Sequence, residues 1–204
     1  ITRMSALVDQ VAELHRKGVE VVLISSGAVA SGRSEIKAGK KLDPVSARQL
    51  YSAVGQAKLI NRYYELFREH GMTCGQVLTT KENFGSRTHY LNQKHCMEVM
   101  LENKVIPIVN ENDTVSVEQI RFGDNDTLSA IVAGIINADV LMILTDIDGV
   151  YDKNPKVYPD AKRLSVIEKI DDEVRAMAGG AGSARGTGGM ATKIRAAEIA
   201  GRAN

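Results

Sequence analysis

The sequence predicts an α/β protein built as a three-layer α/β/α sandwich on a mostly parallel sheet. Helical patterns alternate with short apolar runs along the chain, and these runs are apolar throughout instead of alternating with polar residues. Strands of a parallel sheet have this continuous apolar pattern when helices cover both faces of the sheet. Small and polar residues follow several of the runs, where sheets of this class bind their ligands.

Six elements are predicted up to residue 109. They are helix 4–17, strand 19–24, helix 44–70, strand 72–78, helix 90–102 and strand 105–109. Asp43 and Pro44 are typical of a helix start, because an acidic N-cap accepts first-turn hydrogen bonds and proline needs no donor there. Gly55 is a candidate break in the long helix. Pro107 has no N–H group, which indicates a position near a sheet edge or a strand start.

Seven further segments are predicted after residue 113, and the chain changes character after residue 146. We predict a hairpin over 114–122, a helix from 124 to 137, a buried strand over 140–144, a loop over 148–155, a short helix over 171–177, a glycine-rich run over 179–189 and a final helix from Met190. A chain of 204 residues is long enough for one sizeable core, so one domain is expected.

Composition and charge argue against several classes of protein. The net charge is +1 and the basic residues are scattered, so no stripe for nucleic acid or an anionic membrane is present. No apolar run approaches the roughly 20 residues of a membrane span, and no signal-peptide pattern opens the chain. We therefore expect a cytoplasmic protein with a small-molecule ligand. Neither the two cysteines nor the four histidines show ligand spacing, so no metal site is expected.

Four short segments follow the predicted strands or open the next helix, and they carry the candidate chemistry. They are 25–28, 110–113, 123–126 and 145–146. Ligands of open α/β sheets bind beyond the carboxyl ends of the strands. Glycine and serine give backbone access there, and Asn and Asp offer donors and anionic acceptors.

Residues 186–193, Gly-Thr-Gly-Gly-Met-Ala-Thr-Lys, form the most specific segment. Glycines before a helix N-terminus let backbone N–H groups point at phosphate oxygens, and the helix dipole adds to the attraction. Lys193, one turn inside the helix, could lie over the β- and γ-phosphates as a point charge. The spacing is not that of a Walker A loop, and a glycine linker before an ordinary helix is the alternative.

Together these segments resemble the amino-acid-kinase family, and within it the glutamate 5-kinases, over essentially the whole chain. The resemblance is carried by 25–30, 53–56, 109–113, 123–130, 144–146, 149–151 and 186–193. It implies the carbamate-kinase-like fold, with a glutamate lobe over 1–137 and an ATP lobe over 138–204. It also implies transfer of the ATP γ-phosphoryl group to the side-chain carboxylate of L-glutamate, the first step of proline biosynthesis.

The resemblance assigns roles to individual residues. Ser26, Asp113 and Asn125 match glutamate-binding positions of the family. Lys193 matches a catalytic lysine, and Asp126 matches the aspartate that orients the catalytic lysines. The ATP-binding positions correspond to Thr145, Asp146, Thr187, Gly188, Gly189, Met190, Ala191, Thr192 and Lys193.

Local alternatives stay open for three of these residues. Ser26 could be a turn residue, and Asp113 could be a helix or hairpin cap. Asp126 could be a first-turn acid that favours the helix dipole.

The resemblance also implies partners. MgATP is the phosphoryl donor, with Mg²⁺ held chiefly by the nucleotide and waters. Proline is the implied feedback inhibitor, and a homo-oligomer is the implied assembly. The family's Lys-x-Gly-Ser motif, which ends its first strand, is absent, so we expect that strand, the last strand after Gly201 and any PUA domain to lie outside this chain. Alternatives are another family member, such as a UMP or acetylglutamate kinase, or a non-catalytic amino-acid or nucleotide sensor.

Overall fold

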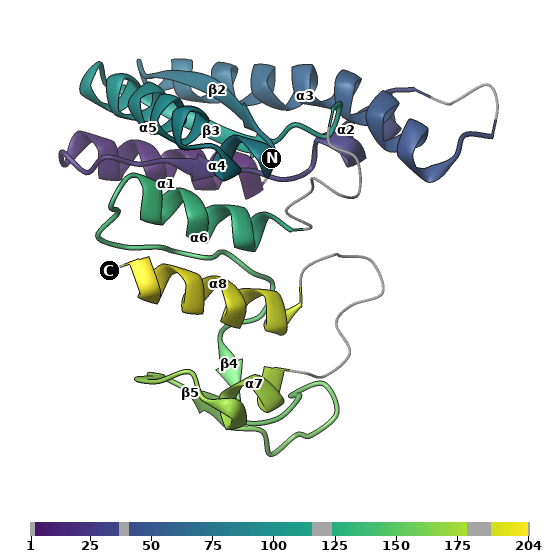
Figure 1. Ribbon diagram of the computed structural model, residues 1–204, viewed down its shortest axis with the longest axis vertical. Coiled ribbons are helices and arrows are strands. Elements are labelled where there is room, and N and C mark those ends of the chain that lie inside the picture. The colour runs from purple at the N-terminus through teal and green to yellow at the C-terminus, as the bar shows by residue number, and fades with distance from the viewer. Residues whose placement is uncertain (1–2, 37–40, 116–123, 179–188, 204) are drawn as a thin grey trace. The chain divides into compact units, whose positions relative to one another are not determined.

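The structure is a computed structural model that describes residues 3–36, 41–115, 124–178 and 189–203. The chain divides into two compact units, Ile1–Phe122 and Gly123–Asn204. The elements of the first unit are α1 Arg3–Arg16, β1 Leu23–Ile24, α2 Ala28–Glu35, α3 Pro44–Glu69, β2 Thr73–Thr79, α4 Glu82–Gly85, α5 Arg87–Glu102 and β3 Val105–Glu111. Those of the second are α6 Asn125–Ile135, β4 Val150–Tyr151, β5 Arg163–Leu164, α7 Asp172–Ala178 and α8 Met190–Ala203 (Figure 1).

The first unit contains a parallel sheet in the order β1–β3–β2, which confirms the predicted α/β class. Strand β1 pairs with β3 at Leu23 and Ile108, and β2 pairs with β3 along its whole length from Thr73 and Val105. Because the strands are parallel, their carboxyl ends lie at the same edge of the sheet. This edge brings together the polar segments that follow β1 and β3.

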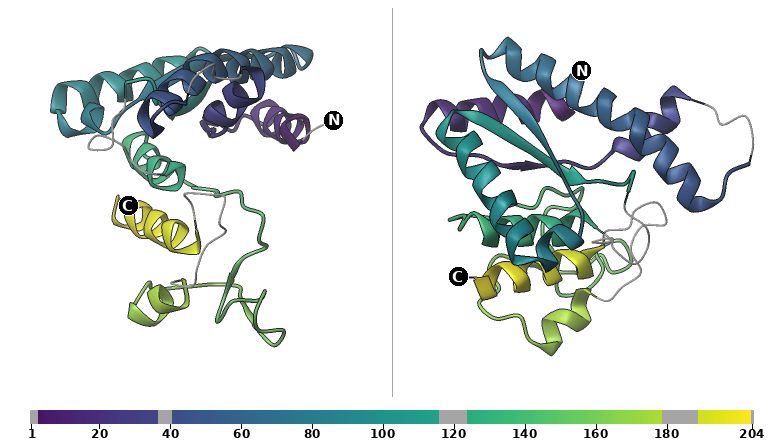
Figure 2. Two further views of the ribbon diagram at one scale, coloured as in Figure 1. Left: turned by 90° about the vertical axis from the view of Figure 1, so that its right-hand side faces the viewer. Right: turned by 45° about the horizontal axis from the view of Figure 1, so that its top comes forward.

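Helices cover both faces of this sheet (Figure 2). On one face, Val8 of α1 and Phe67 of α3 share a buried core with Cys74 of β2. On the other face, Met100 of α5 lies against Gly75, the next residue of β2. Successive residues of a strand point to opposite faces, so the first unit has the predicted layers of helix, sheet and helix.

Strand β1 is shorter than the predicted strand 19–24. Its pairing with β3 covers only Leu23 and Ile24, and the register would next place Val22 beside Pro107. Proline has no N–H group for a further ladder bond, which accounts for the early end of the pairing. Pro107 is near the start of β3, as one predicted alternative has it, but β3 is the central strand of this sheet, so the edge alternative is wrong.

Helix α3 begins at the predicted residue. The carboxylate of Asp43 accepts hydrogen bonds from the N–H groups of Val45 and Ser46, both at 3.0 Å. The suggested break at Gly55 is wrong, because the helix is continuous over Pro44–Glu69. A Cβ atom on Gly55 would lie 1.7 Å from the carbonyl oxygen of Ala28. Glycine is therefore required there by the close approach of α2 to α3.

The second unit is built on the packing of α6 along α8. Val174 and Ala178 of α7 form a buried cluster with Ile194 of α8, and Val150 packs against it. Strand β4, which the sequence predicted as part of a loop, pairs with β5 in a short antiparallel ribbon. Helices α6, α7 and α8 agree with their predictions to within two residues at their described starts.

The predicted strand 140–144 is not formed. These residues have no regular secondary structure, and Val140, Met142 and Leu144 are exposed. A strand requires a neighbour for its N–H and C=O groups. In the part of the chain that the structure describes, no strand pairs with this segment.

Three further observations complete the comparison with the predictions. Most of the predicted hairpin, residues 116–122, lies outside the described residues. The boundary between the compact units falls before Gly123, whereas the glutamate and ATP lobes were divided after Asn137 on functional grounds, and that division stays a prediction. Among the described helices, none is long and apolar enough to cross a membrane.

Candidate active site

The turn after β1 presents Ser26 at the carboxyl edge of the sheet. Ser26 is exposed, whereas the preceding Ser25 is buried and forms a hydrogen bond of 2.9 Å with the hydroxyl of Tyr63. The N–H of Ser25 donates to the carbonyl of Val109, which ties the turn to β3. Gly27 has a φ of 105°, a conformation that L side chains rarely adopt, and it opens α2. The turn is thus anchored by Ser25 and leaves Ser26 accessible.

Burial controls the protonation of the tyrosine that holds this turn. Removal of the Tyr63 hydroxyl from water raises its pKa, and the hydrogen bond with Ser25 opposes the shift. Tyr63 is therefore neutral at physiological pH and serves as a fixed hydrogen-bonding group.

The turn after β3 holds Asp113 in a buried ion pair. Asp113 Oδ1 accepts a hydrogen bond from Arg48 Nε at 2.7 Å and lies 2.6 Å from Arg48 Nη2. The same Nη2 lies 4.0 Å from Glu111 Oε2. Side chains of the two acids are only 8% and 4% exposed, respectively. Two carboxylates and the Arg48 guanidinium therefore lie together at the carboxyl edge of the sheet.

Side chains of α3 fix the backbone of this turn. Gln56 donates to the carbonyl of Glu111 at 3.3 Å, and Gln49 donates to the carbonyl of Thr114 at 3.0 Å. From the end of β2, the carbonyl of Thr79 accepts from the N–H of Asn112 at 2.7 Å. These bonds satisfy backbone groups that burial would otherwise leave unpaired. The position of Asp113 is therefore set from both sides of the turn.

In the second unit, Asp126 and Lys193 form an ion pair at the starts of two helices. Lys193 Nζ donates to both carboxylate oxygens of Asp126, at 3.0 and 3.3 Å. Thr192 Oγ1 lies 2.7 Å from Asp126 Oδ2 and 2.8 Å from the carbonyl of Gly189, so its proton has two acceptors. The Lys193 and Asp126 side chains are 20% and 16% exposed. The ammonium is thus held in place at the head of α8 while it keeps access to solvent.

A helix cap places Asp126. The carboxylate of Asp124 accepts from the N–H of Thr127 at 2.6 Å and from its hydroxyl at 3.1 Å, which fixes the first turn of α6. Asn125 is the first residue of this helix and is half-buried. Because α6 packs along α8, the first turn of α6 carries Asp126 to the first turn of α8.

The other predicted ATP-binding residues have different surroundings. Thr145 and Asp146 are exposed in an irregular segment, where Thr145 Oγ1 lies 3.4 Å from Asp146 Oδ1. Met190 packs against the apolar cluster of α7 and α8 instead of standing free, and Ala191 is exposed. Thr187 and Gly188 lie outside the described residues.

Sequence reasoning missed Arg48 and the contact between Thr192 and Asp126. Arg48 is separated from Asp113 by 65 residues, and nothing in the sequence around it marks it as an ion-pair partner. The hydroxyl of Thr192 contacts Asp126, and its predicted role in ATP binding stays a prediction. A signal for Thr192 was available, because it lies in the first turn of the same helix as the predicted lysine.

The donor groups at the head of α8 fit phosphate chemistry. An ammonium, a hydroxyl and the first N–H groups of a 14-residue helix are the donors that phosphate oxygens accept. Within the described ranges, no three His, Cys, Asp or Glu side chains gather as metal ligands.

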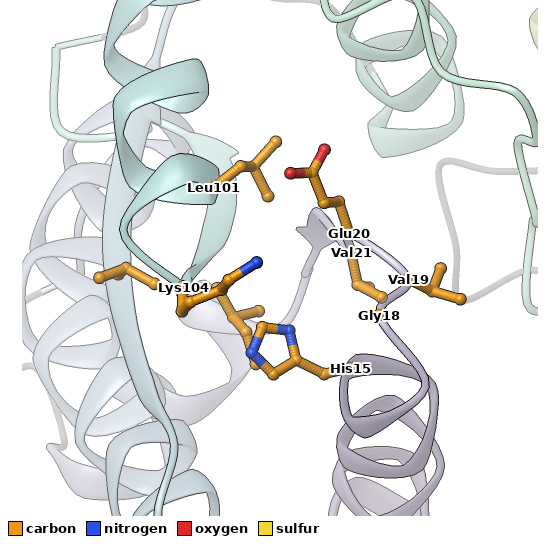
Figure 3. Close-up of a pocket in the computed structure, with 9 residues that line it drawn as sticks. His15, Gly18, Val19, Glu20, Val21, Leu101 and Lys104 are labelled. Atoms are coloured by element: carbon orange, nitrogen blue, oxygen red, sulfur yellow. The ribbon is translucent and has the colours of Figure 1, made fainter.

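The first unit has a recess (Figure 3). It is lined by residues 18–21 ahead of β1 and 104–106 at the start of β3, with His15 and Leu101 beside them. The recess therefore lies at the amino ends of β1 and β3, where these two strands are not paired. None of the predicted site residues lines the recess.

Comparisons with known proteins identify the family of the chain. The sequence model of the amino acid kinase family matches residues 2–204. The chain is 61% identical over 199 residues to the glutamate 5-kinase of Bacteroides thetaiotaomicron, which covers 97% of the chain and 54% of that protein. It is 48% identical to the glutamate 5-kinase of Caldanaerobacter subterraneus, with 96% and 53% covered. For that of Clostridium acetobutylicum, the identity is 47%, with 97% and 74% covered.

The extent of these matches decides what they establish. The chain spans about half the length of the Bacteroides and Caldanaerobacter relatives and about three quarters of the Clostridium one. The family model, by contrast, covers nearly every residue of the chain. The resemblance seen in the motifs is confirmed, and the chain belongs to the amino acid kinase family.

Proposed function

We propose that the protein is a glutamate kinase, which transfers the γ-phosphoryl group of ATP to the side-chain carboxylate of L-glutamate. The observation that carries the proposal is the ion pair between Lys193 and Asp126, which holds an ammonium at the head of a glycine-led helix. Relatives with 45–61% identity that are named glutamate 5-kinases support the choice of acceptor. The proposed phosphorylation of glutamate is the first step of proline biosynthesis.

The first unit supplies candidate groups for the acceptor. Glutamate carries an ammonium, which needs an anion, and two carboxylates, which need donors. Asp113 is the buried anion at the carboxyl edge of the sheet, and Ser26 is the accessible hydroxyl there. We propose that Asp113 binds the ammonium and Ser26 a carboxylate. The role of Asn125 in glutamate binding stays a prediction from the resemblance.

The second unit supplies candidate groups for the phosphoryl donor, MgATP. Lys193 provides a compact positive charge, and the first N–H groups of α8, starting after Gly189, provide donors for the phosphates. Asp126 holds the Lys193 ammonium, and Thr192 contacts Asp126, so the conformational freedom of the lysine is reduced before the reaction. Thr145 and Asp146 are proposed to contact the nucleotide.

The chemistry needs little from the protein besides position and charge. The glutamate carboxylate is already ionised at neutral pH, so its oxygen can attack the γ-phosphorus without a general base. The new bond joins that oxygen to phosphorus, and the bond from phosphorus to the β,γ-bridging oxygen breaks, which releases ADP. Lys193 would stabilise the charge that shifts between the two oxygens. Mg²⁺, when bound with ATP, neutralises phosphate charge.

Three further features are proposed from the family resemblance alone. They are inhibition by proline, assembly into a homo-oligomer and a cytoplasmic location. The test for the first is a loss of activity on addition of L-proline, and the test for the second is the mass of the protein in solution.

The central test measures ADP release by the full-length protein in MgATP. Addition of L-glutamate should start ADP release, and hydroxylamine should trap the acyl phosphate as a hydroxamate. UMP and N-acetyl-L-glutamate are the comparison acceptors. Equal or faster turnover with either of them would contradict the proposal, and glutamate binding without ADP release would indicate a sensor.

A further inference from the structure

We propose that Tyr63 is a positioning residue for the acceptor site, which acts through Ser25 on the orientation of Ser26. The inference rests on the proposed function, because Ser26 is one of the groups proposed to bind glutamate. Tyr63 itself is buried in the core of the first unit, so it would not contact the acceptor.

The first argument is the direction of the hydrogen bonds that start at Tyr63. Ser25 Oγ donates to the carbonyl oxygen of Ser26 at 3.3 Å, and a carbonyl can only accept. A serine hydroxyl has one proton, so the Tyr63 hydroxyl, which lies 2.9 Å from Ser25 Oγ, is the donor of that second bond. Two hydrogen bonds in sequence therefore connect a buried ring of α3 with the backbone of the exposed residue Ser26.

The second argument is that this pair of hydrogen bonds acts on the peptide with the most freedom to rotate. The N–H of Ser25 donates to a carbonyl of β3, which fixes the start of the turn. Ala28 lies against Gly55 of α3, which fixes its end. Between them, Gly27 has a φ of 105° and no side chain that would hinder rotation of the preceding peptide. The orientation of the peptide that joins Ser26 to Gly27 therefore depends on the bond from Ser25.

The third argument is that α3 also holds the other side of the proposed acceptor site. Arg48 contacts the Asp113 carboxylate at 2.6 and 2.7 Å, and Tyr63 lies on the same continuous helix. One helix thus positions both the turn with Ser26 and the turn with Asp113. The distance between the proposed partners of the glutamate carboxylate and ammonium depends on both attachments. A misplacement of about 1 Å can cost about 10²-fold in rate.

The variant Tyr63→Phe would release the turn without opening a cavity in the core. It keeps the ring, which stacks with Phe67 at 6.4 Å between the centroids. It leaves Ser25 Oγ without its donor in a buried position. Hydrogen bonds in a chain polarise one another, so the bond from Ser25 to Ser26 weakens when its donor is lost.

The test uses the full-length protein with Tyr63→Phe, Ser25→Ala, the two changes combined and the control Tyr64→Phe. Tyr64 is the next residue of the same helix, and its side chain is exposed. In steady-state kinetics, each of the first two variants should raise KM for L-glutamate about three- to tenfold, the range for one neutral hydrogen bond, and change KM for ATP by less than about twofold. Tyr64→Phe should leave both KM values unchanged.

The combined variant tests whether Tyr63 acts through Ser25. In Ser25→Ala the route to Ser26 is already broken, so the additional loss of the Tyr63 hydroxyl should raise KM for glutamate by no more than about twofold. Independent effects would multiply instead. Urea unfolding shows that each variant is folded under the assay conditions. If Tyr63→Phe does not fold, Tyr63→Met takes its place in both measurements.

The outcomes distinguish this inference from the proposed function. If the wild-type protein neither binds nor phosphorylates glutamate, the proposed function fails and the inference fails with it. If the wild type is active and the Tyr63 variant does not reach the expected increase in KM for glutamate, the inference alone is overturned. Multiplied effects in the combined variant would also overturn it, because Tyr63 would then act by another route. Equal increases in both KM values would make Tyr63 a general structural residue and overturn it as well.

Discussion

Replacement of Lys193 by methionine removes a charge and keeps most of the side-chain volume. In the structure, Nζ contacts both oxygens of Asp126 at 3.0 and 3.3 Å, and both side chains are about four-fifths buried, with 20% and 16% exposed. The variant leaves Asp126 with Thr192 as a hydrogen-bond donor. The perturbation is therefore local: one positive charge is lost at the head of α8.

The expected effects follow from these contacts. At 3.0 Å and an effective dielectric constant near 20, the attraction in the ion pair is roughly 5 kcal/mol before desolvation is subtracted. Because desolvation cancels most of it and Thr192 still serves Asp126, we expect a stability loss of about 1–3 kcal/mol. The catalytic loss is larger. Removal of one donor to developing charge costs about 10²–10³ in kcat, or roughly 3–4 kcal/mol.

The assay combines steady-state kinetics with a direct ATP titration on folded protein. An interaction that strengthens in the transition state is lost mainly from kcat, so nucleotide affinity should fall by less than kcat. Lys193→Arg should rescue poorly, because a planar fork does not replace a compact ammonium. Lys153→Met is the matched control, since Lys153 pairs with Asp160 on the exposed surface of the same unit.

A small effect on turnover would refute this reasoning. If Lys193→Met keeps kcat within about threefold of the wild type, less than 1 kcal/mol of transition-state stabilisation is involved. Lys193 would then be a structural partner of Asp126, and the preceding glycines a linker. A large fall in ATP affinity at unchanged kcat would instead assign Lys193 to ground-state nucleotide binding.

Three other substitutions test separate parts of the site. Asp113→Ala should raise KM for glutamate at least tenfold and KM for ATP much less, since a charged hydrogen bond contributes about 1.5–3 kcal/mol; parallel increases would contradict the division of roles. Thr192→Val should lower kcat about three- to tenfold, as expected for one lost hydrogen bond of about 1 kcal/mol, and Thr192→Ser should restore it. If Thr192→Val lowers mainly the affinity for ATP, Thr192 acts in nucleotide binding instead. Tyr63→Phe should destabilise the fold by about 1 kcal/mol near neutral pH through the lost bond to Ser25. Because burial raises the pKa of Tyr63, the wild type keeps this stability below the unfolded-state pKa of about 10 and loses it as pH rises further. The urea midpoints of the wild type and Tyr63→Phe should therefore approach each other above that pH, and a constant difference would contradict the assignment.

The starts of α3 and α6 were predictable because their causes are local. Asp43 and Asp124 accept hydrogen bonds from residues two or three positions later, so the sequence alone contains both partners. The long strands β2 and β3 were predictable for a related reason, since their apolar runs match strands that are covered on both faces. The edge at which Ser26 and Asp113 lie follows from the parallel order of these strands.

The irregular structure of 140–144 and the role of Gly55 were not predictable, because each depends on a distant neighbour. The run 140–144 is as apolar as β3, yet it has no strand beside it in the described residues and stays irregular. Gly55 reads as a helix breaker, but its role is to admit the backbone of α2 at Ala28. A sequence pattern reports burial, whereas hydrogen-bond partners and close contacts are set by packing.

The sequence by itself determined the fold class, the family and the segments that carry the candidate chemistry. Tertiary structure alone decided how those residues are paired. Arg48 lies 65 residues from Asp113, and Thr192 lies 66 residues from Asp126, and each pair meets because two elements pack side by side. The physical reason is that an ion pair or hydrogen bond acts over about 3 Å, a distance that chain folding sets and that no local pattern of residues encodes.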